Sequence, residues 1–453
     1  MFSISTFPIL FIAGLTFIVR TCALLNSVKS VSYQIGGNPN CLSFGNNVTS
    51  AIMKKLFTAL FAVILLAGCG NNEEQLIKRA DKIHKNYLSI DTHCDTPLDI
   101  MRSGFDLGEK HDKGCVDFPR MAEGGLDAEF LAAYIGQGPR DDSSTNQANL
   151  DILGIIDAIY KNVEKNSAMA EIALSPDDAY RLKKVGKLSA FIGIENGYPV
   201  GKDISRIKQY YDLGARYITL CHSGNNDICD SSSDPKGPEH NGLSSFGEEV
   251  VKEMNRLGMM IDISHMSDGS FYDVLSVSKA PVIASHSSSR ALCSSPRNLS
   301  DDMLLALKKN GGVIQICILS SYIKTPEPNP ELEAKLAELK SKYGDFRALS
   351  DEERNQFRNE RWEIMNNYRK LATVADVVDH IDHVVQVIGI DHVGIGTDFD
   401  GGGGVDGCRS VAEMKNITIE LLRRGYSKAD IGKIWGGNTM RVFREVEKTA
   451  HGS

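Results

Sequence analysis

Histidine and acidic residues recur in this sequence at the ends of short apolar runs. His93 and Asp95 end one run, Glu195 ends another, and His265 and His286 end two more. Imidazole and carboxylate groups are the usual protein ligands of zinc, and a catalytic zinc takes three of them and leaves one position for water. Two such ions can share a water, lower its pKa and stabilise an anionic intermediate from both sides. These residue types indicate hydrolysis at a metal centre, if the fold brings them together.

The spacing of His93 and Asp95 suits two ligands of one ion. Side chains two positions apart lie on the same face of a strand, so both would point toward the same place. Cys94 lies between them and would point to the opposite face. We therefore do not expect Cys94 to be a ligand.

A second ion would be held by His265 and His286, and the two oxygens of Glu195 could bridge both ions. A single histidine at a strand end is more often structural than ligating. Several ionisable groups at the ends of the predicted strands instead indicate a metal site, because burying them without partners or metal is costly. The remaining histidines lack this placement, and we interpret them as structural or surface residues: His84, His111, His240, His380, His383, His392 and His451.

The elements that must position these side chains are eight apolar runs of strand length, separated by helix-length segments. Such runs between amphipathic stretches predict βα units around a buried parallel sheet, and eight units predict a closed (β/α)8 TIM-type barrel. In such a barrel the carboxyl ends of the strands converge on one mouth, so sequence distance between the ligands no longer matters. The runs are 88–95, 128–135, 188–195, 215–222, 258–265, 280–286, 311–318 and 392–398.

Helix signals agree with this alternation. Ser300 followed by two aspartates, a basic end and Gly311 predicts a helix with a serine cap, an acidic first turn and a glycine stop. The charged segment 331–368 predicts a helical insertion between the seventh and eighth strands, and 411–448 predicts C-terminal helices that complete the fold.

Eight stretches of the chain resemble the membrane (renal-type) dipeptidase family of zinc peptidases, in the same order, from about Tyr87 to Phe443. One departure concerns Cys293, which resembles a disulfide-forming cysteine of animal members but has no evident counterpart here, so we expect no such bridge. The matching stretches are 90–95, 193–196, 217–222, 262–265, 285–288, 297–298, 392–401 and 437–443.

The resemblance implies two zinc ions per chain and a role for each strand-end residue. His93 and Asp95 would bind one ion and His265 and His286 the other, with Glu195 bridging them.

Three further roles follow from the same resemblance. His222 would hydrogen-bond the substrate carbonyl oxygen, Arg297 would bind the C-terminal carboxylate, and Asp398 would transfer protons. Asp400 is the alternative to Asp398, two positions along and so on the same face of a strand.

The expected activity is hydrolysis of dipeptides, including those with a D-residue on the C-terminal side. Binding both free charges of the substrate would restrict its length to two residues. Two alternatives remain open: another binuclear-metal barrel amidohydrolase, and a non-catalytic peptide-binding surface lipoprotein. Amidohydrolases usually carry His-x-His after the first strand, whereas this chain has His-x-Asp at His93.

The N-terminal region predicts an export signal. Met53 is followed by two lysines, an apolar run at 56–66 and then Leu-Ala-Gly before Cys69, which resembles the lipobox of bacterial lipoproteins. We expect a signal peptide at 53–68, a lipid anchor on Cys69, a linker at 69–80 and the catalytic domain at 81–450. Residues 1–52 would come from a start codon assigned too early. The protein would then be a cell-envelope lipoprotein, attached to the membrane only through its lipid.

Composition excludes some other classes. The net charge of −8 leaves no basic stripe for nucleic acid. After Cys69 seven cysteines remain, an odd number, so complete disulfide pairing is impossible and most are expected to be small core residues. The family resemblance also suggests a homodimer.

Overall fold

The sheet of this protein is built from parallel strands in the order β1-β2-β4-β5-β6-β7-β8-β9, with β3 paired to β4. The structure is a computed structural model, and it describes residues 73–452 of the 453-residue chain. The strands within this range are β1 (Ile90–Cys94), β2 (Ala128–Tyr134), β3 (Ala170–Ile172), β4 (Leu188–Glu195), β5 (Ala215–Thr219), β6 (Met260–Asp262), β7 (Ile283–Ser287), β8 (Val313–Ile316) and β9 (Val393–Ile395).

The sheet curls so that β9 returns to β1. The backbone N–H of Asp95 donates to the carbonyl of Phe399 over 2.8 Å, and that of Asp398 donates to the carbonyl of His93 over 3.0 Å. Each of the eight predicted apolar runs contains one strand of this barrel, and the (β/α)8 prediction is confirmed. The three-residue β3 was not predicted; it pairs with the first residues of β4, before β4 meets β5 at Ile192.

Strands of this barrel are apolar on both faces because both faces are buried. On the inside, the rings of Phe130, Phe191 and Tyr217 pack with centroids 4.8 and 5.1 Å apart. On the outside, Ile192 and Ile194 of β4 belong to the larger cluster between strands and helices. Burying one such side chain contributes about 1.5–3 kcal/mol, which explains the near-continuous apolar runs.

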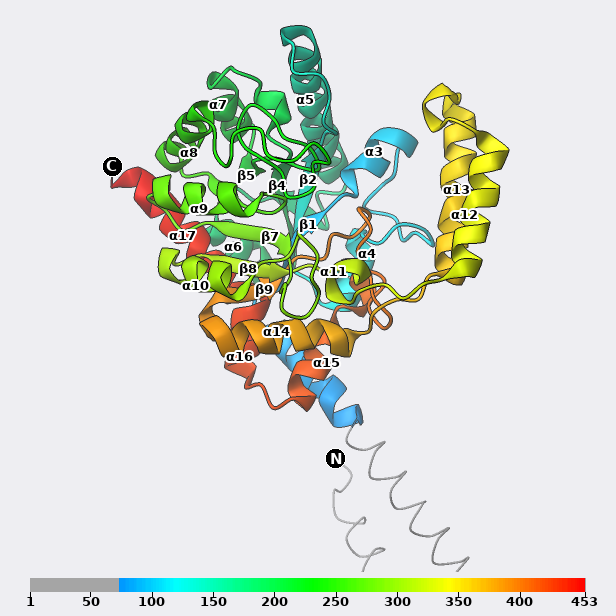
Figure 1. The fold of residues 1–453 in the computed structure, drawn as a ribbon. Helices are drawn as coiled ribbons and strands as arrows, with labels where there is room; N and C mark the ends of the chain where they lie inside the picture. Colours follow the sequence, from blue (N-terminus) through cyan, green and yellow to red (C-terminus); the bar gives the residue numbers. More distant parts are fainter. Residues whose placement is uncertain (1–72, 453) are drawn as a thin grey trace, which may run out of the picture. The chain divides into compact units, whose positions relative to one another are not determined.

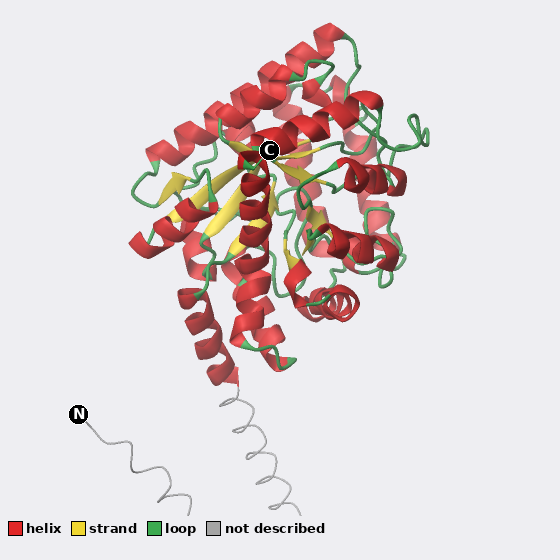
Figure 2. Ribbon diagram, turned by 90° about the vertical axis from the view of Figure 1, so that its left-hand side faces the viewer, coloured by secondary structure: helices red, strands yellow, loops and turns green. Residues whose placement is uncertain are grey.

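Helices surround the strands on all sides (Figures 1 and 2). α10 begins after Ser300, whose side chain accepts from the N–H of Met303, and it ends at Gly311 with φ +84°, as predicted. The helices within 90–452 are α3 (Pro97–Ser103), α4 (Phe118–Gly124), α5 (Asp142–Lys165), α6 (Pro176–Val185), η2 (Tyr198–Val200), α7 (Ser205–Asp212), α8 (Ser245–Leu257), α9 (Asp268–Val277), α10 (Asp301–Asn310), α11 (Ser320–Ile323), α12 (Pro330–Tyr343), η3 (Phe346–Ala348), α13 (Asp351–Tyr368), α14 (Val374–Ile388), η4 (Ile390–His392), η5 (Val411–Glu413), α15 (Lys415–Arg423), α16 (Lys428–Gly432), η6 (Lys433–Gly437) and α17 (Asn438–His451).

The predicted insertion between the seventh and eighth barrel strands is a helical hairpin, α12 and α13, drawn in yellow in Figure 1. Leu339 is a buried side chain of this hairpin, and Tyr343 and Phe346 pack around Phe357 with ring centroids 5.5 and 5.3 Å away. The predicted C-terminal helices are also present, and α17 packs Phe443 against Phe191 of the barrel interior.

The described chain begins with a helix at 73–86. This helix starts within the segment predicted as a linker at 69–80 and extends beyond it. Leu76, Ala80 and Ile83 on one side of this helix are buried in the core, so packing begins before the predicted domain start at residue 81. The predicted signal peptide and Cys69 lie outside the described residues. None of the helices within 73–452 has the length and apolar character needed to cross a bilayer.

Candidate active site

The carboxyl ends of β1, β4, β6 and β7 bring the five predicted metal ligands together in one buried cluster. The side chain of Glu195 lies at its centre. Its Oε2 is 3.6 Å from His93 Nε2, whereas its Oε1 is 3.1 Å from His265 Nε2 and 3.5 Å from His286 Nε2. Asp95 Oδ2 lies 3.9 Å from His93 Nε2. One oxygen of Glu195 therefore faces His93, and the other faces His265 and His286.

This cluster has the unsatisfied atoms expected of a metal site. Buried polar groups normally have hydrogen-bond partners. Within the described part of the chain, however, His93 Nε2 and Asp95 Oδ1 are buried without one. His265 Nε2 and His286 Nε2 face each other at 2.8 Å. Imidazoles and carboxylates aimed at a common space are a suitable donor set for one or two divalent cations.

The hydrogen bonds behind the ligands set the tautomer of two histidines. His93 Nδ1 is 2.9 Å from the hydroxyl of Tyr217, which itself donates to the carbonyl of Thr92. His286 Nδ1 is 2.8 Å from the hydroxyl of Ser285, which itself donates to Asp262. Because these hydroxyl protons are already used, both hydroxyls accept from Nδ1–H. In the neutral form of each histidine the lone pair is then at Nε2, which faces Glu195, as metal coordination requires.

The electrostatics of the cluster favour a cation. Burial by itself lowers the pKa of His93, but the negative charges of Glu195 and Asp95 outweigh burial and raise that pKa to about 10. Burial raises the pKa of Asp95 well above its usual range, and the charge of Glu195 adds to this effect. A positive charge beside these carboxylates is therefore strongly stabilised, and a metal ion supplies it without protonating the imidazole.

Asp398 is presented by a turn beyond β9 rather than by the strand itself. The carboxylate of Asp91 accepts from the N–H of Thr397 at 2.8 Å and also from the Thr397 hydroxyl, which ties this turn to β1. Asp398 has φ +60°, and a carboxylate oxygen of Asp398 lies within 4.8 Å of ligand atoms of His93 and Asp95. Burial raises the pKa of Asp398 to about 7; His93 and Arg297 oppose this shift and Glu195 adds to it.

The expectation that Asp400 shares a strand face with Asp398 is wrong. β9 ends at Ile395, and both aspartates have left-handed backbone conformations, so strand alternation does not extend to them. The Asp400 carboxylate instead accepts from the Thr96 hydroxyl at 2.6 Å and from the backbone N–H of Cys115 at 2.7 Å. Asp400 therefore anchors surrounding loops.

His222 and Arg297 border the cluster. His222 follows β5, and its Nε2 is 3.7 Å from Glu195 Oε1. Arg297 is only 5% exposed; one terminal nitrogen donates to the carbonyl of His286 at 3.2 Å, and its guanidinium lies 5.3 Å from the ring centre of Tyr322. Its Nε is buried without a partner among the described residues. The site thus has an imidazole and a buried guanidinium beside the candidate metal ligands.

The histidines interpreted as structural lie away from this cluster. His84 bonds the carbonyl of Gly125 and the hydroxyl of Thr418, and His380 lies between the N–H of Ser289 and the carbonyl of Ile323. The side chain of Cys94 is buried in the larger hydrophobic cluster, between the barrel strands and the surrounding helices. Among the described residues the seven cysteines are free.

Sequence reasoning missed three hydroxyl residues that contact the site: Tyr134, Tyr217 and Ser285. Tyr217 and Ser285 lie in the same predicted strands as His222 and His286, and Tyr134 ends a strand for which no polar residue was singled out. The available signal was strand alternation, which places Tyr134 on the same inner face as Phe130.

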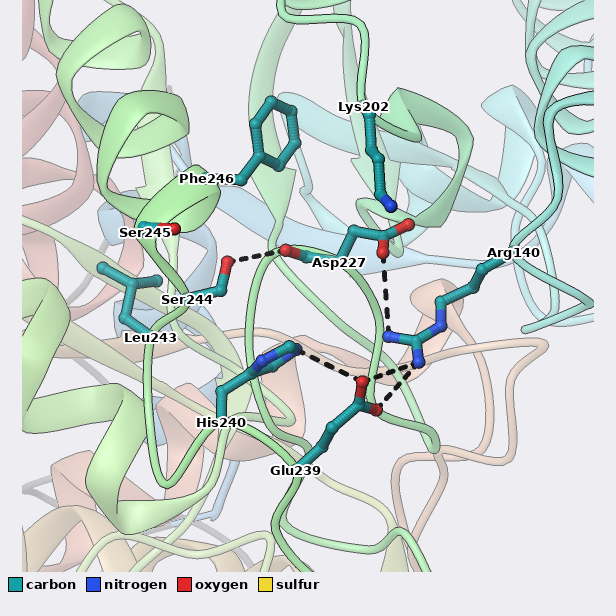
Figure 3. Close-up of a pocket in the computed structure, with 9 residues that line it drawn as sticks. All are labelled: Arg140, Lys202, Asp227, Glu239, His240, Leu243, Ser244, Ser245 and Phe246. Atoms are coloured by element: carbon teal, nitrogen blue, oxygen red, sulfur yellow. Dashed lines mark hydrogen bonds and ion pairs between the residues drawn. The ribbon is translucent and has the colours of Figure 1, made fainter.

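A hollow of about 740 Å³ lies among the loops that follow β2, β4 and β5 (Figure 3). Arg140, from the loop after β2, makes two bonds of 2.7 and 2.9 Å to Glu239 and lies 3.8 Å from Asp227. Both acidic residues belong to the loop after β5, which also carries His222. This ion-pair group therefore links two loops at the carboxyl ends of the strands.

Comparison with known proteins identifies close relatives of this chain. A sequence model of the family described as membrane dipeptidase, peptidase family M19, matches residues 77–453. Dipeptidase tcpJ of Claviceps purpurea is 35% identical over 342 residues, which cover 74% of this chain and 70% of that protein. Dipeptidase aclJ of Aspergillus oryzae is 33% identical over 347 residues, covering 75% and 72%. The crystal structure of the probable dipeptidase PvdM from Pseudomonas aeruginosa has a TM-score of 0.72 and 32% identity, covering 83% of this chain and 100% of that one.

Proposed function

The chain belongs to the membrane dipeptidase family, peptidase family M19, and is a metallo-dipeptidase; from this premise we propose that its metal is a pair of zinc ions. The observation that carries the proposal is the position of Glu195. One carboxylate oxygen faces His93, and the other faces His265 and His286. A carboxylate shared in this way suits a bridging ligand between two cations.

Each ion would have three protein ligands. His93, Asp95 and one oxygen of Glu195 would hold the first, and His265, His286 and the other oxygen would hold the second. When bound, a zinc pair lowers the pKa of a shared water so that hydroxide is available at neutral pH. The mixture of imidazole and carboxylate donors favours zinc over calcium or magnesium, which prefer oxygen ligands alone.

The remaining residues would act on the substrate. His222 Nε2 would donate a hydrogen bond to the carbonyl oxygen as negative charge develops there, a contribution of about 3–4 kcal/mol for one donor. Arg297 would bind the C-terminal carboxylate with parallel N–H bonds. Asp398 would accept a proton from the attacking water and pass it to the leaving amine, because its carboxylate oxygen lies beside the ligand atoms of His93 and Asp95.

Recognition of two opposite charges would limit the substrate to dipeptides. Arg297 would bind the carboxylate, and the acidic side chains of the cluster would attract the free amine. A longer peptide cannot place both charges at once. On the family resemblance, the proposal includes dipeptides with a D-residue on the C-terminal side.

The test is a panel of substrates with purified, zinc-loaded protein. Leu-Gly and a dipeptide with a C-terminal D-residue should be hydrolysed, whereas a tripeptide, an N-acetylated dipeptide and adenosine should not. Two zinc ions per chain are expected by elemental analysis. Adenosine turnover, or one zinc per chain at full activity, would favour another barrel amidohydrolase.

Attachment to the cell envelope through Cys69 remains a proposal that rests on the sequence alone, as does a homodimer. Incorporation of labelled fatty acid into the protein, abolished by Cys69→Ala, would support the lipid anchor. Native protein that retains residues before Met53 would contradict it.

A further inference from the structure

Tyr134 occupies a position beside the candidate catalytic groups that the proposed mechanism does not use. It is the last residue of β2 and pairs in register with Glu195, the last residue of β4. Its ring packs against that of His222 with centroids 4.8 Å apart and planes inclined by 61°. Its hydroxyl oxygen lies 3.4 Å from His222 Nδ1. Tyr134 thus contacts His222 at Nδ1, whereas Nε2 of the same ring lies 3.7 Å from Glu195 Oε1.

The hydroxyl of Tyr134 differs from those behind the metal ligands. Tyr217 and Ser285 donate their protons to other groups and can only accept from the histidines they contact. In the described part of the chain, the Tyr134 hydroxyl has no hydrogen-bond partner except His222 Nδ1. A phenol has an ordinary pKa of about 10, so the Tyr134 hydroxyl carries its proton at neutral pH. This hydroxyl is therefore free to donate to His222.

We propose that Tyr134 is a positioning residue that donates a hydrogen bond to Nδ1 of His222 and thereby keeps the ring proton of His222 on Nε2. This inference rests on the proposed function, in which His222 Nε2 donates to the substrate carbonyl oxygen. A neutral imidazole carries one ring proton, and the partner of one nitrogen decides which nitrogen holds it. His93 and His286 would be held in the opposite tautomer, with Nε2 free to bind metal.

The neighbouring hydroxyl of Ser223 supports the same assignment. Its oxygen is 3.2 Å from His222 Nδ1. The nitrogen faces two hydroxyl groups and no carbonyl or carboxylate among its described partners, so nothing there requires a proton on Nδ1. Ser223 is exposed, whereas Tyr134 is partly buried and packs its ring against that of His222, so Tyr134 provides the better-ordered donor.

The loops on either side hold Tyr134 and His222 in contact. Arg140 and Glu239 join the loop after β2 to the loop after β5, as Figure 3 shows. Ser231, in the loop after β5, donates to the carbonyl of His222 at 2.5 Å. The backbone of both partners is thus tied at the mouth of the barrel. The 3.4 Å separation can shorten when substrate binds, as hydrogen bonds in catalytic sites often do.

The kinetic test compares Tyr134→Phe with Tyr198→Phe. Both changes remove one phenolic hydroxyl, but that of Tyr198 donates to the carbonyl of Pro139 at 2.6 Å and does not contact His222. For Tyr134→Phe we expect kcat on Leu-Gly to fall about 10- to 100-fold, the usual effect of losing an orienting partner, with KM within about twofold. Tyr198→Phe should keep kcat within about twofold.

A spectroscopic test reads the tautomer directly. In zinc-loaded protein with ¹⁵N-labelled histidine, the His222 signals, assigned by their loss in His222→Gln, should show a protonated Nε2 and an unprotonated Nδ1. Tyr134→Phe should move the ring proton of His222 toward Nδ1, where the Ser223 hydroxyl can accept a hydrogen bond from Nδ1–H. The inference is overturned if His222 in the wild-type protein carries its proton on Nδ1, or if Tyr134→Phe changes neither the tautomer nor kcat.

A failure of this inference can be distinguished from a failure of the proposed function. If the wild-type protein hydrolyses Leu-Gly and Tyr134→Phe behaves like Tyr198→Phe, the positioning role of Tyr134 is wrong, and the proposed dipeptidase function is unaffected. If zinc-loaded wild-type protein hydrolyses no dipeptide, the proposed function is wrong, and the assignment of Tyr134 falls with it.

Discussion

Replacing Arg297 with methionine should weaken the enzyme mainly toward substrates that carry a free C-terminal carboxylate. Arg297 is 5% exposed, and its Nε has no partner among the described residues, so a guanidinium group is held desolvated and incompletely bonded. A substrate carboxylate would complete its hydrogen bonds. Arg297→Met keeps a long apolar side chain over Tyr322 but removes the charge and every donor.

The size of the effect follows from the burial. Loss of one partner from a buried, hydrogen-bonded charge pair costs 2–5 kcal/mol. The guanidinium also makes one bond to the carbonyl of His286, so not all of its donors are available to substrate. We therefore expect Arg297→Met to raise the activation free energy that governs kcat/KM by about 3–4 kcal/mol. This corresponds to a loss of about 150- to 800-fold in kcat/KM.

The assay compares Leu-Gly with Leu-Gly amide, which lacks the carboxylate. Arg297→Met should lower kcat/KM for Leu-Gly by the amount above and that for the amide by less than about tenfold. Arg290→Met is the control, because Arg290 lies in the same loop but pairs with Asp268 at 2.7 Å on the surface. Equal losses on the two substrates would refute carboxylate recognition and would show that Arg297 acts by supporting His286.

Three further outcomes are expected. Asp398→Asn should lower kcat about 10²- to 10⁴-fold while the zinc content stays unchanged, because it removes proton transfer but no proposed ligand; loss of zinc would contradict this role. Chelation should abolish activity and lower Tm, and zinc should restore both, since buried carboxylates are left uncompensated without it. Burial lowers the pKa of His84 to about 4, so the unfolded chain takes up a proton below about pH 6.5 and the folded chain does not. Lowering the pH from 8 to 5 should therefore reduce the free energy of unfolding by about 2 kcal/mol through His84 alone. The free energy of unfolding of His84→Gln, measured with urea, should lack that part of the pH dependence.

The strands were predictable because a parallel barrel buries both faces of each one. An apolar run such as 188–195 has few other ways to bury its side chains, and its last residue must lie at the mouth. For this reason the convergence of Glu195 with His93, His265 and His286 could be expected from sequence alone. The three-residue β3 carries no comparable signal, because so short a segment has no periodicity.

Features of the site that depend on loop backbone were not predictable. Asp398 and Asp400 have φ of +60° and +64°, so counting in steps of two beyond β9 placed Asp400 on the wrong face. The sequence pattern indicates only that Tyr134 and Tyr217 are core aromatic residues, because a sequence does not reveal where a buried hydroxyl points.

The central claim is that Glu195 bridges two metal ions, and anomalous X-ray scattering at the zinc edge from crystals of the zinc-loaded protein tests it most directly. The account predicts two peaks about 3.5–4 Å apart, with His93 and Asp95 on one, His265 and His286 on the other, and one oxygen of Glu195 on each. A single peak, or two peaks of which Glu195 binds only one, would contradict it.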